Sequence, residues 1–260
     1  MDYQMEYYEI ENFWNNEPTK SDIERIEKVS KLIPPNVQSI LDVGCGNGIF
    51  VNYLIDQPRK YSRIYGVDRS QTALKYVKTE KTRASIEKLP FNEGEFDLVA
   101  CLEVLEHLSQ PAFKQALIEL TRVSSKYIIV AVPNKQNLKI GQISCANCYT
   151  RFNPNLHLQS FDFKSLKELF SGYDFSCKKV EAICRVEAYA VASNLLQWKT
   201  KYQFLKNRGT FNLICPVCGA IIPGIKNLAK DKPNIFKNLV KKVWPKTYRK
   251  RWLVALYERN

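Results

Sequence analysis

The stretch SILDVGCGNG, from Ser39 to Gly48, decides the fold predicted for this chain. Its apolar run, Ile40 to Val43, is typical of a buried parallel strand, and the apolar residues after Gly48 recur at helical spacing. Three glycines at alternate positions join the two elements. Because glycine lacks a Cβ and tolerates a positive φ angle, the backbone can approach a ligand closely at the N-terminus of the following helix.

A carboxylate follows the glycine turn at the distance that a ribose site needs. The second apolar run, Ile64 to Val67, ends at Asp68, about 20 residues beyond the turn. An ionised carboxylate can accept hydrogen bonds from two ribose hydroxyls. The glycines read G-x-G-x-G after Asp42, whereas a dinucleotide site is marked by G-x-G-x-x-G. A nicotinamide site and a plain glycine turn remain the alternatives.

Strands and helices alternate along the first half of the chain. The elements predicted after Asp68 are a helix from Ser70, strands at 83–86 and 96–101, a helix at 112–123 and a strand at 126–134. Alternation at this spacing predicts a doubly wound, mostly parallel sheet with helices on both faces. Residues 37–134 are therefore expected to form one α/β unit.

The motifs of this unit resemble those of the Rossmann-like, or class I, S-adenosylmethionine-dependent methyltransferases. The first motif of that family is (I/L)-L-D-x-G-C-G-x-G, and the likeness continues through Asp97, E-V-L-E-H-L at 103–108 and V-P-N at 132–134. The resemblance implies a Rossmann-like fold and S-adenosyl-L-methionine as cofactor. It also implies the cofactor-binding residues, which are Asp42, Gly44, Cys45, Gly46, Gly48, Asp68, Ser85, Ile86, Glu87 and Cys101.

The sequence departs from the family at the expected adenine contact. Many relatives read D-A-x-x-L-P-F there, with an acid that touches the adenine amine, whereas this chain reads S-I-E-K-L-P-F from Ser85 to Phe91. Either Ser85 with backbone groups or Glu87 would then take that contact. The missing acid keeps open a different class of protein, a non-catalytic binding module with the same fold.

The stretch Glu103-Val104-Leu105-Glu106-His107 holds the candidate catalytic residues. On a helix, Glu103, Glu106 and His107 would share one face and could serve a hard cation or a general base. E-x-x-E-H is similar to a stretch of small-RNA 2′-O-methyltransferases and ubiquinone-pathway O-methyltransferases, where it carries a divalent metal. His157 would be a fourth ligand. Without a metal, His107 is the candidate base, because its ordinary pKa lies near neutrality.

Four of the eight cysteines form two C-x-x-C pairs, Cys145 with Cys148 and Cys215 with Cys218. Two such pairs can make a tetrahedral thiolate site, for which Zn²⁺ is the usual occupant. Four thiolates leave no open position, so the predicted zinc is structural. The segment resembles the zinc-binding insert of some bacterial methyltransferases, and unrelated buried cysteines are the alternative.

The two ends of the chain have contrasting composition. Residues 1–36 are predicted to form a helical, aromatic cap with a capping box at Ser21–Glu24, packed over the domain or acting as a lid over the cofactor. Residues 226–260 carry eleven lysines and arginines against two acids, a large share of a net charge of +13. Apolar residues recur at helical spacing among these basic residues, which predicts a basic amphipathic helical tail. This tail could contact a membrane surface, RNA or its own domain. Residues 135–225 are assigned to the remainder of the fold with its insert.

These features define the expected function and location. No run of about 18 apolar residues predicts a membrane span, and no signal peptide is recognised, so we expect a cytoplasmic protein, or one peripheral at the inner membrane face. The expected reaction is O-methylation of a small-molecule, sugar or lipid-linked acceptor. A metal-dependent RNA 2′-O-methyltransferase is the enzymatic alternative.

Overall fold

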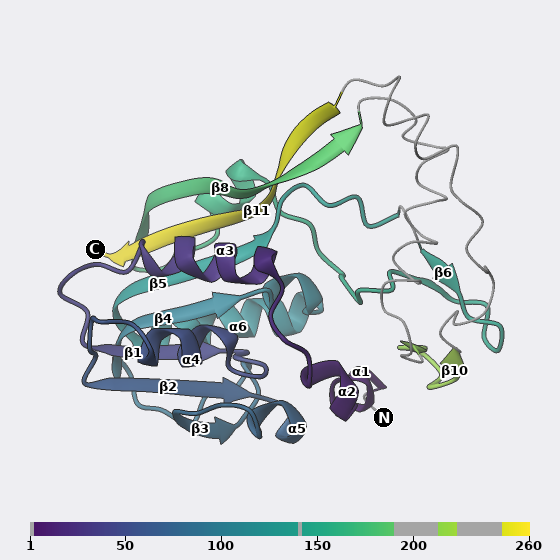
Figure 1. Ribbon diagram of the computed structural model, residues 1–260, viewed down its shortest axis with the longest axis horizontal. Helices are drawn as coiled ribbons and strands as arrows, with labels where there is room; N and C mark the ends of the chain where they lie inside the picture. The colour runs from purple at the N-terminus through teal and green to yellow at the C-terminus, as the bar shows by residue number, and fades with distance from the viewer. Residues whose placement is uncertain (1–2, 140–141, 190–212, 223–245) are drawn as a thin grey trace. The chain divides into compact units, whose positions relative to one another are not determined.

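The computed structural model describes residues 3–139, 142–189, 213–222 and 246–260 (Figure 1). The chain divides into two compact units. The larger, here the sheet unit, comprises residues 8–136, 157–184 and 251–260, and the smaller, here the cysteine unit, comprises residues 1–7, 137–156 and 185–250.

The central sheet has seven strands in the order β3-β2-β1-β4-β5-β11-β8. Their bounds are β1 Ser39–Val43, β2 Arg63–Asp68, β3 Glu80–Arg83, β4 Phe96–Leu102, β5 Ser124–Pro133, β8 Phe175–Tyr189 and β11 Lys246–Arg259. Strands β1 to β5 pair in parallel, with Ile40 opposite Ile64 on one side and Leu98 on the other. This confirms the mostly parallel sheet predicted from the alternation of elements.

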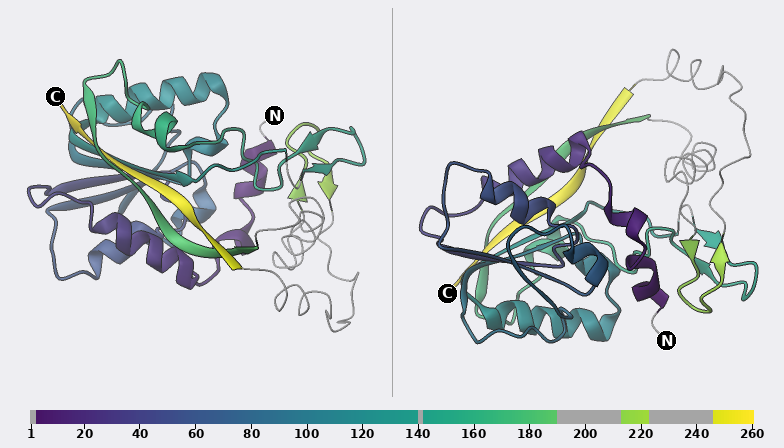
Figure 2. Two further views of the ribbon diagram at one scale, coloured as in Figure 1. Left: turned by 90° about the horizontal axis from the view of Figure 1, so that it is seen from above. Right: turned by 60° about the horizontal axis from the view of Figure 1, so that its bottom comes forward.

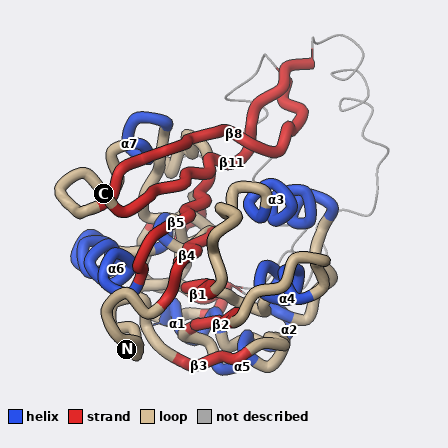
Figure 3. Tube along the Cα trace, turned by 90° about the vertical axis from the view of Figure 1, so that its left-hand side faces the viewer, coloured by secondary structure: helices blue, strands red, loops and turns tan. Residues whose placement is uncertain are grey.

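Helices cover both faces of the sheet (Figure 3). On one face, α3 (Lys20–Ser30) and α4 (Ile49–Ile55) bury Val29 and Phe50 against Leu98. On the other face, α6 (Gln110–Val123) and α7 (Phe163–Lys167) bury Leu120 and Leu166. The central strands are apolar on both sides because neither face meets water.

Short elements complete the architecture and refine several predicted boundaries. They are α1 (Tyr3–Tyr8), α2 (Glu11–Trp14), α5 (Gln71–Leu74) and the 3₁₀ turn η1 (Leu105–His107). The capping box of α3 belongs to Thr19 and Asp22, not to Ser21, because Asp22 is the residue whose carboxylate reaches back to the Thr19 N–H, at 3.0 Å. The third strand ends at Arg83, where it was predicted to begin.

The end of the chain corrects the predicted helical tail. Residues Lys246–Arg259 form β11, antiparallel to β5 and next to β8 in the sheet (Figure 2). Leu253, Ala255 and Tyr257 enter one hydrophobic cluster, whereas Trp252 and Val254 enter the other. A run that buries alternate residues on opposite faces suits a strand between two layers, whereas a surface helix buries a single stripe. Residues 226–245 of the predicted tail lie outside the described residues.

The described part of the cysteine unit contains two small hairpins. One is formed by β6 (Ile143–Ser144) and β7 (Arg151–Phe152), and the other by β9 (Leu213–Ile214) and β10 (Ile221–Ile222). Among the residues that the structure describes, no helix is long and apolar enough to cross a membrane.

Candidate functional site

The glycine loop lies between β1 and α4 and makes close contacts that a side chain would prevent. Gly44, Gly46 and Gly48 have φ angles of +76°, +54° and +81°, in the left-handed region. A Cβ on Gly44 would lie 2.3 Å from Cγ2 of Val104. The loop therefore packs directly against the stretch that holds the candidate catalytic residues.

Asp68, at the end of β2, holds this loop in place. Its Oδ2 accepts a hydrogen bond from the Gly46 N–H at 2.8 Å, and its Oδ1 accepts one from the Ser70 N–H at 2.8 Å. Burial raises the pKa of Asp68, although these backbone donors oppose the shift. Each carboxylate oxygen has a second lone pair, so the group can still accept hydrogen bonds from a ligand.

Asp42 is the second buried carboxylate of the loop. Its side chain is 2% exposed, and its Oδ1 has no hydrogen-bond partner among the described residues. Burial, followed by the nearby charge of Asp68, raises the pKa of Asp42 to about 8. A buried carboxylate without a partner is costly unless a cation or a donor reaches it.

The E-V-L-E-H stretch does not form the predicted single helical face. Glu103 has a φ of +60°, and only Leu105–His107 form a 3₁₀ turn. The Glu103 carboxylate lies 3.2 Å from Nη1 of Arg25 and accepts a hydrogen bond from Nε1 of Trp252 at 2.7 Å. Glu103 is therefore paired with Arg25 on α3 and Trp252 on β11, and it acts on Glu106 through its charge rather than as a member of the group formed by Glu106, His107 and His157.

Glu106, His107 and His157 do come together. One ligand atom from each lies within 4.8 Å of the others, and the two imidazole rings meet edge to face with centroids 4.5 Å apart. The N–H groups of Leu158 and Gln159 donate to the Glu106 carbonyl at 2.7 and 3.1 Å, which brings His157 to this turn. The arrangement can hold a divalent cation or supply a general base.

The Glu106 carboxylate is the most deeply buried member of this cluster. It is 1% exposed, and neither carboxylate oxygen has a hydrogen-bond partner among the described residues. Burial and the neighbouring charge of Glu103 raise its pKa well above the usual range. Because a desolvated carboxylate without a donor gains most from a cation, these residues fit the predicted divalent metal.

Comparison with known proteins places these features in a family. The methyltransferase domain family matches residues 41–127. An uncharacterized protein of Methanocaldococcus jannaschii is 30% identical over 184 residues, which are 67% of this chain and 76% of that protein. A solved S-adenosylmethionine-dependent methyltransferase of Archaeoglobus fulgidus has a TM-score of 0.54 at 15% identity, covering 97% of this chain and 99% of that one. The chain belongs to the Rossmann-like S-adenosylmethionine-dependent methyltransferases.

Another relative of this methyltransferase has a more specific name. The ubiquinone biosynthesis O-methyltransferase of Albidiferax ferrireducens is 32% identical over 99 residues, 34% of this chain. The match spans 38% of that relative's length. Because the match covers only about a third of each chain, it does not identify the acceptor.

The loop of the methyltransferase fits S-adenosylmethionine. The three glycines form a cradle that a Cβ would fill, and the unpartnered Asp42 oxygen suits a positively charged ligand. Beyond β3, the Ser85 hydroxyl donates a hydrogen bond to Glu87 Oε2 at 3.1 Å. The two residues predicted as alternatives for the adenine contact are therefore direct neighbours. Ile86 beside them is buried.

The two cysteines predicted for the methyltransferase cofactor site have buried side chains. Cys101 lies near the carboxyl end of β4, but its side chain is fully buried in the core. Cys45 is buried in a small cluster with Val51 and Leu74, and a Cβ on Gly66 would lie 2.9 Å from its sulfur. Burial raises the pKa of both thiols, as expected of unreactive core cysteines.

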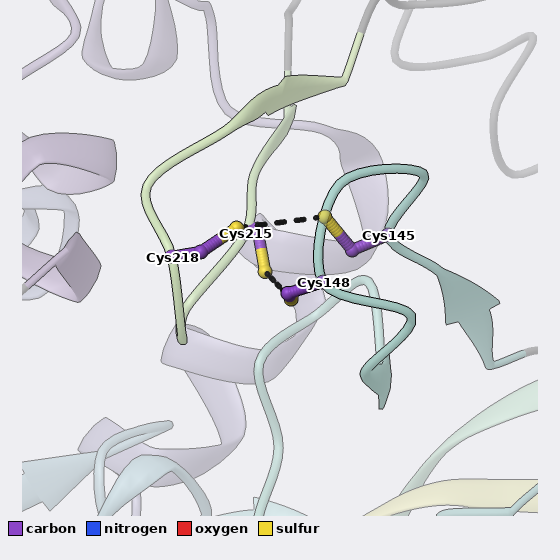
Figure 4. A group of neighbouring side chains, drawn as sticks. All are labelled: Cys145, Cys148, Cys215 and Cys218. Carbon is purple, nitrogen blue, oxygen red and sulfur yellow. Dashed lines mark hydrogen bonds between the residues drawn. The ribbon is translucent and has the colours of Figure 1, made fainter.

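The two C-x-x-C pairs of the methyltransferase converge within the cysteine unit (Figure 4). The sulfurs of Cys145 and Cys218 are 3.6 Å apart, those of Cys148 and Cys215 are 3.7 Å apart, and all four lie within 4.8 Å of one another. The spacing of the pairs thus correctly indicated a common site.

Both pairs occupy the same kind of hairpin turn. The N–H of Tyr149 donates to the Cys145 carbonyl at 2.9 Å, and the N–H of Gly219 donates to the Cys215 carbonyl at 3.0 Å. Tyr149 and Gly219 have matching φ angles of +59° and +72°. The Asn147 amide, which donates to the Cys218 sulfur at 3.5 Å, lowers the pKa of that thiol to about 6. The turns present four sulfurs, a donor set that suits Zn²⁺.

Proposed function

We propose that this methyltransferase acts on a hydroxyl group of a small-molecule, sugar or lipid-linked acceptor. The proposal rests on the position of His107 at the carboxyl end of the parallel strands, where sheets of this kind bind their ligands. The contact of Val104 with Gly44 supports it, because a base three residues from Val104 then lies near the cofactor loop. The name of the ubiquinone biosynthesis relative is consistent with a hydroxyl acceptor.

The residues of the site divide the reaction between them. When bound, S-adenosylmethionine supplies a methyl group activated by a sulfonium. The glycine loop and Asp68 would hold the ribose and methionine parts, and Asp42 lies buried near the end of β1, just before the loop. His107 would take the proton of the acceptor hydroxyl as the oxygen–methyl bond forms and the sulfur–methyl bond breaks, with the sulfur leaving as a neutral thioether. The protein's main contribution is alignment for in-line attack.

The second candidate function is metal-dependent 2′-O-methylation of RNA. The observation that favours it is the convergence of Glu106, His107 and His157 within 4.8 Å. A divalent cation held there would lower the cost of deprotonating an acceptor hydroxyl. In that case His107 is a ligand and not the base, and Glu103 stays with Arg25.

We also propose that the four cysteines of the cysteine unit hold one structural Zn²⁺. Purified protein should then contain about one zinc per chain, and Cys215→Ser should lose it. Cys177→Ser is the matched control, because Cys177 belongs to the sheet unit. Metal analysis by mass spectrometry makes the comparison, and zinc-free protein with unchanged stability would contradict this assignment.

The experiment that tests the main proposal is methyl transfer from radiolabelled S-adenosylmethionine into fractionated cell extract. The full chain is compared with His107→Ala, with and without EDTA. Label in small-molecule, glycan or lipid fractions that resists EDTA and is lost in His107→Ala supports the first function. Label in RNA that EDTA abolishes and Mg²⁺ or Mn²⁺ restores supports the second. Cofactor binding without label in any fraction would contradict both functions and support the alternative of a non-catalytic binding module.

A further inference from the structure

We propose that Tyr8 is a positioning residue for His107, and that it acts through closure of residues 8–14, here the N-terminal segment, over the cofactor site. The inference rests on the proposed role of His107. It goes beyond that role because it names the residue that selects the active tautomer of the imidazole and the segment that carries this residue.

The N-terminal segment is fastened to the start of α5. The Glu9 carboxylate accepts hydrogen bonds from the N–H groups of Gln71 and Thr72, both at 3.0 Å. The hydroxyl of Ser70 donates to the Tyr8 carbonyl at 2.8 Å. Ser70 is also the residue whose N–H is held by Asp68, so the segment binds the element that follows the ribose carboxylate.

The same segment covers the glycine loop. The Asn47 side chain donates to the Trp14 carbonyl at 2.9 Å, and a Cβ on Gly46 would lie 2.8 Å from Cζ3 of the Trp14 indole. Gly46 is the glycine whose N–H bonds to Asp68. Residues 8–14 therefore contact both parts of the cofactor site, which are the glycine loop and the start of α5 beside Asp68.

Tyr8 connects this cover to the catalytic cluster. Its hydroxyl lies 3.2 Å from Nδ1 of His107, and the two rings meet edge to face with centroids 6.2 Å apart. The Tyr8 ring packs on Phe13 at 5.7 Å and near Trp14 at 6.1 Å, which limits its freedom to turn away. The position of the hydroxyl beside His107 therefore depends on the position of this segment.

The chemistry decides which nitrogen carries the proton. Both proposed roles of His107, base and metal ligand, need a lone pair on one ring nitrogen. Since Tyr8 occupies Nδ1, the lone pair must be on Nε2, and Nδ1–H then donates to the Tyr8 oxygen. A phenylalanine at position 8 would keep the packing but remove this acceptor.

The test is nitrogen NMR of the full chain labelled with ¹⁵N-histidine. The chain has only two histidines, so His157→Gln leaves the signals of His107 alone. Spectra are taken at about pH 8.5, well above the ordinary histidine pKa of about 6.5, so that the neutral tautomers are compared. Tyr8→Phe is compared with the control Tyr61→Phe, because Tyr61 stacks on Arg59 away from the site.

We expect His107 to show the Nδ1–H tautomer in the protein with Tyr8 unchanged and in Tyr61→Phe. In Tyr8→Phe the population of this tautomer should fall by at least half. Trp14→Ala, which loosens the segment, should reduce the same tautomer and weaken S-adenosylmethionine binding about tenfold in calorimetry, whereas Trp14→Phe should retain both. An unchanged His107 tautomer in Tyr8→Phe overturns the proposal. Tighter cofactor binding by Trp14→Ala also overturns it, since the segment would then compete with the cofactor.

The test of Tyr8 can be judged separately from the test of the proposed function, because the NMR spectra require no methyl acceptor. The expected tautomer change without methyl transfer into any extract fraction would contradict the O-methyltransferase proposal alone. Methyl transfer with an unchanged tautomer in Tyr8→Phe would contradict the role of Tyr8 alone.

Discussion

Gly44→Ala probes the contact between the cofactor loop and the candidate catalytic stretch. A methyl group at this position would lie 2.3 Å from Cγ2 of Val104, and the backbone there has a φ of +76°. Two separate costs therefore arise, one from the backbone angle and one from the overlap with Val104.

The two costs can be given magnitudes. The left-handed backbone costs a residue with a side chain about 1–2 kcal/mol. Forcing a methyl group into occupied space costs about 1–3 kcal/mol. Gly44→Ala should therefore lower the free energy of unfolding by about 2–5 kcal/mol, and adding Val104→Ala should return about 1–3 kcal/mol of that loss.

Urea unfolding followed by circular dichroism measures both changes. Gly172→Ala is the matched control, because Gly172 has a φ of +96° and no atom within 4 Å of an added Cβ. It should show the backbone cost alone, about 1–2 kcal/mol. If Gly44→Ala destabilises no more than Gly172→Ala, or if Val104→Ala gives no relief, the contact between loop and catalytic stretch is refuted.

Three further predictions concern the charged groups of the site. Asp68→Asn should weaken S-adenosylmethionine binding at least about 10-fold in calorimetry, because a charge-assisted hydrogen bond contributes about 1.5–3 kcal/mol, and the exposed control Asp56→Asn should bind normally. Burial raises the pKa of folded Asp42 from 3.8 to about 8, so the folded protein keeps a proton that the unfolded chain releases between these values. From about pH 5 to about pH 8 this group should lower the free energy of unfolding by up to about 1.4 kcal/mol per pH unit, and Asp42→Asn should reduce the slope by that amount in urea titrations. Arg25→Ala should cost about 1–3 kcal/mol by leaving the partly buried Glu103 without its cation. Glu103→Gln in the same chain should recover part of this loss, whereas a Glu103 that binds metal would instead change the EDTA sensitivity of methyl transfer.

Several features of this methyltransferase follow from local sequence alone. The run Ile40 to Val43, the glycines after it and Asp68 lie where the pattern predicted, because a buried strand needs continuous apolar residues and a tight turn needs positive φ angles. The cap of α7 is equally local, since Asp162 accepts from the N–H of Ser165 at 2.9 Å. The C-x-x-C spacing predicted a joint sulfur site that the structure brings together.

Tertiary structure alone decided which side chains meet. Glu103 and Glu106 look equivalent in E-V-L-E-H, but a positive φ at Glu103 turns it toward Arg25 and Trp252, which are distant in sequence. The contact of Tyr8 with His107 has no local signal for the same reason. The residues of β11 fit both a helical and a strand pattern, and they became a strand because β5 offered a free edge between two apolar layers. Local periodicity specifies a buried face, whereas the partner of each face depends on elements that only the folded chain brings together.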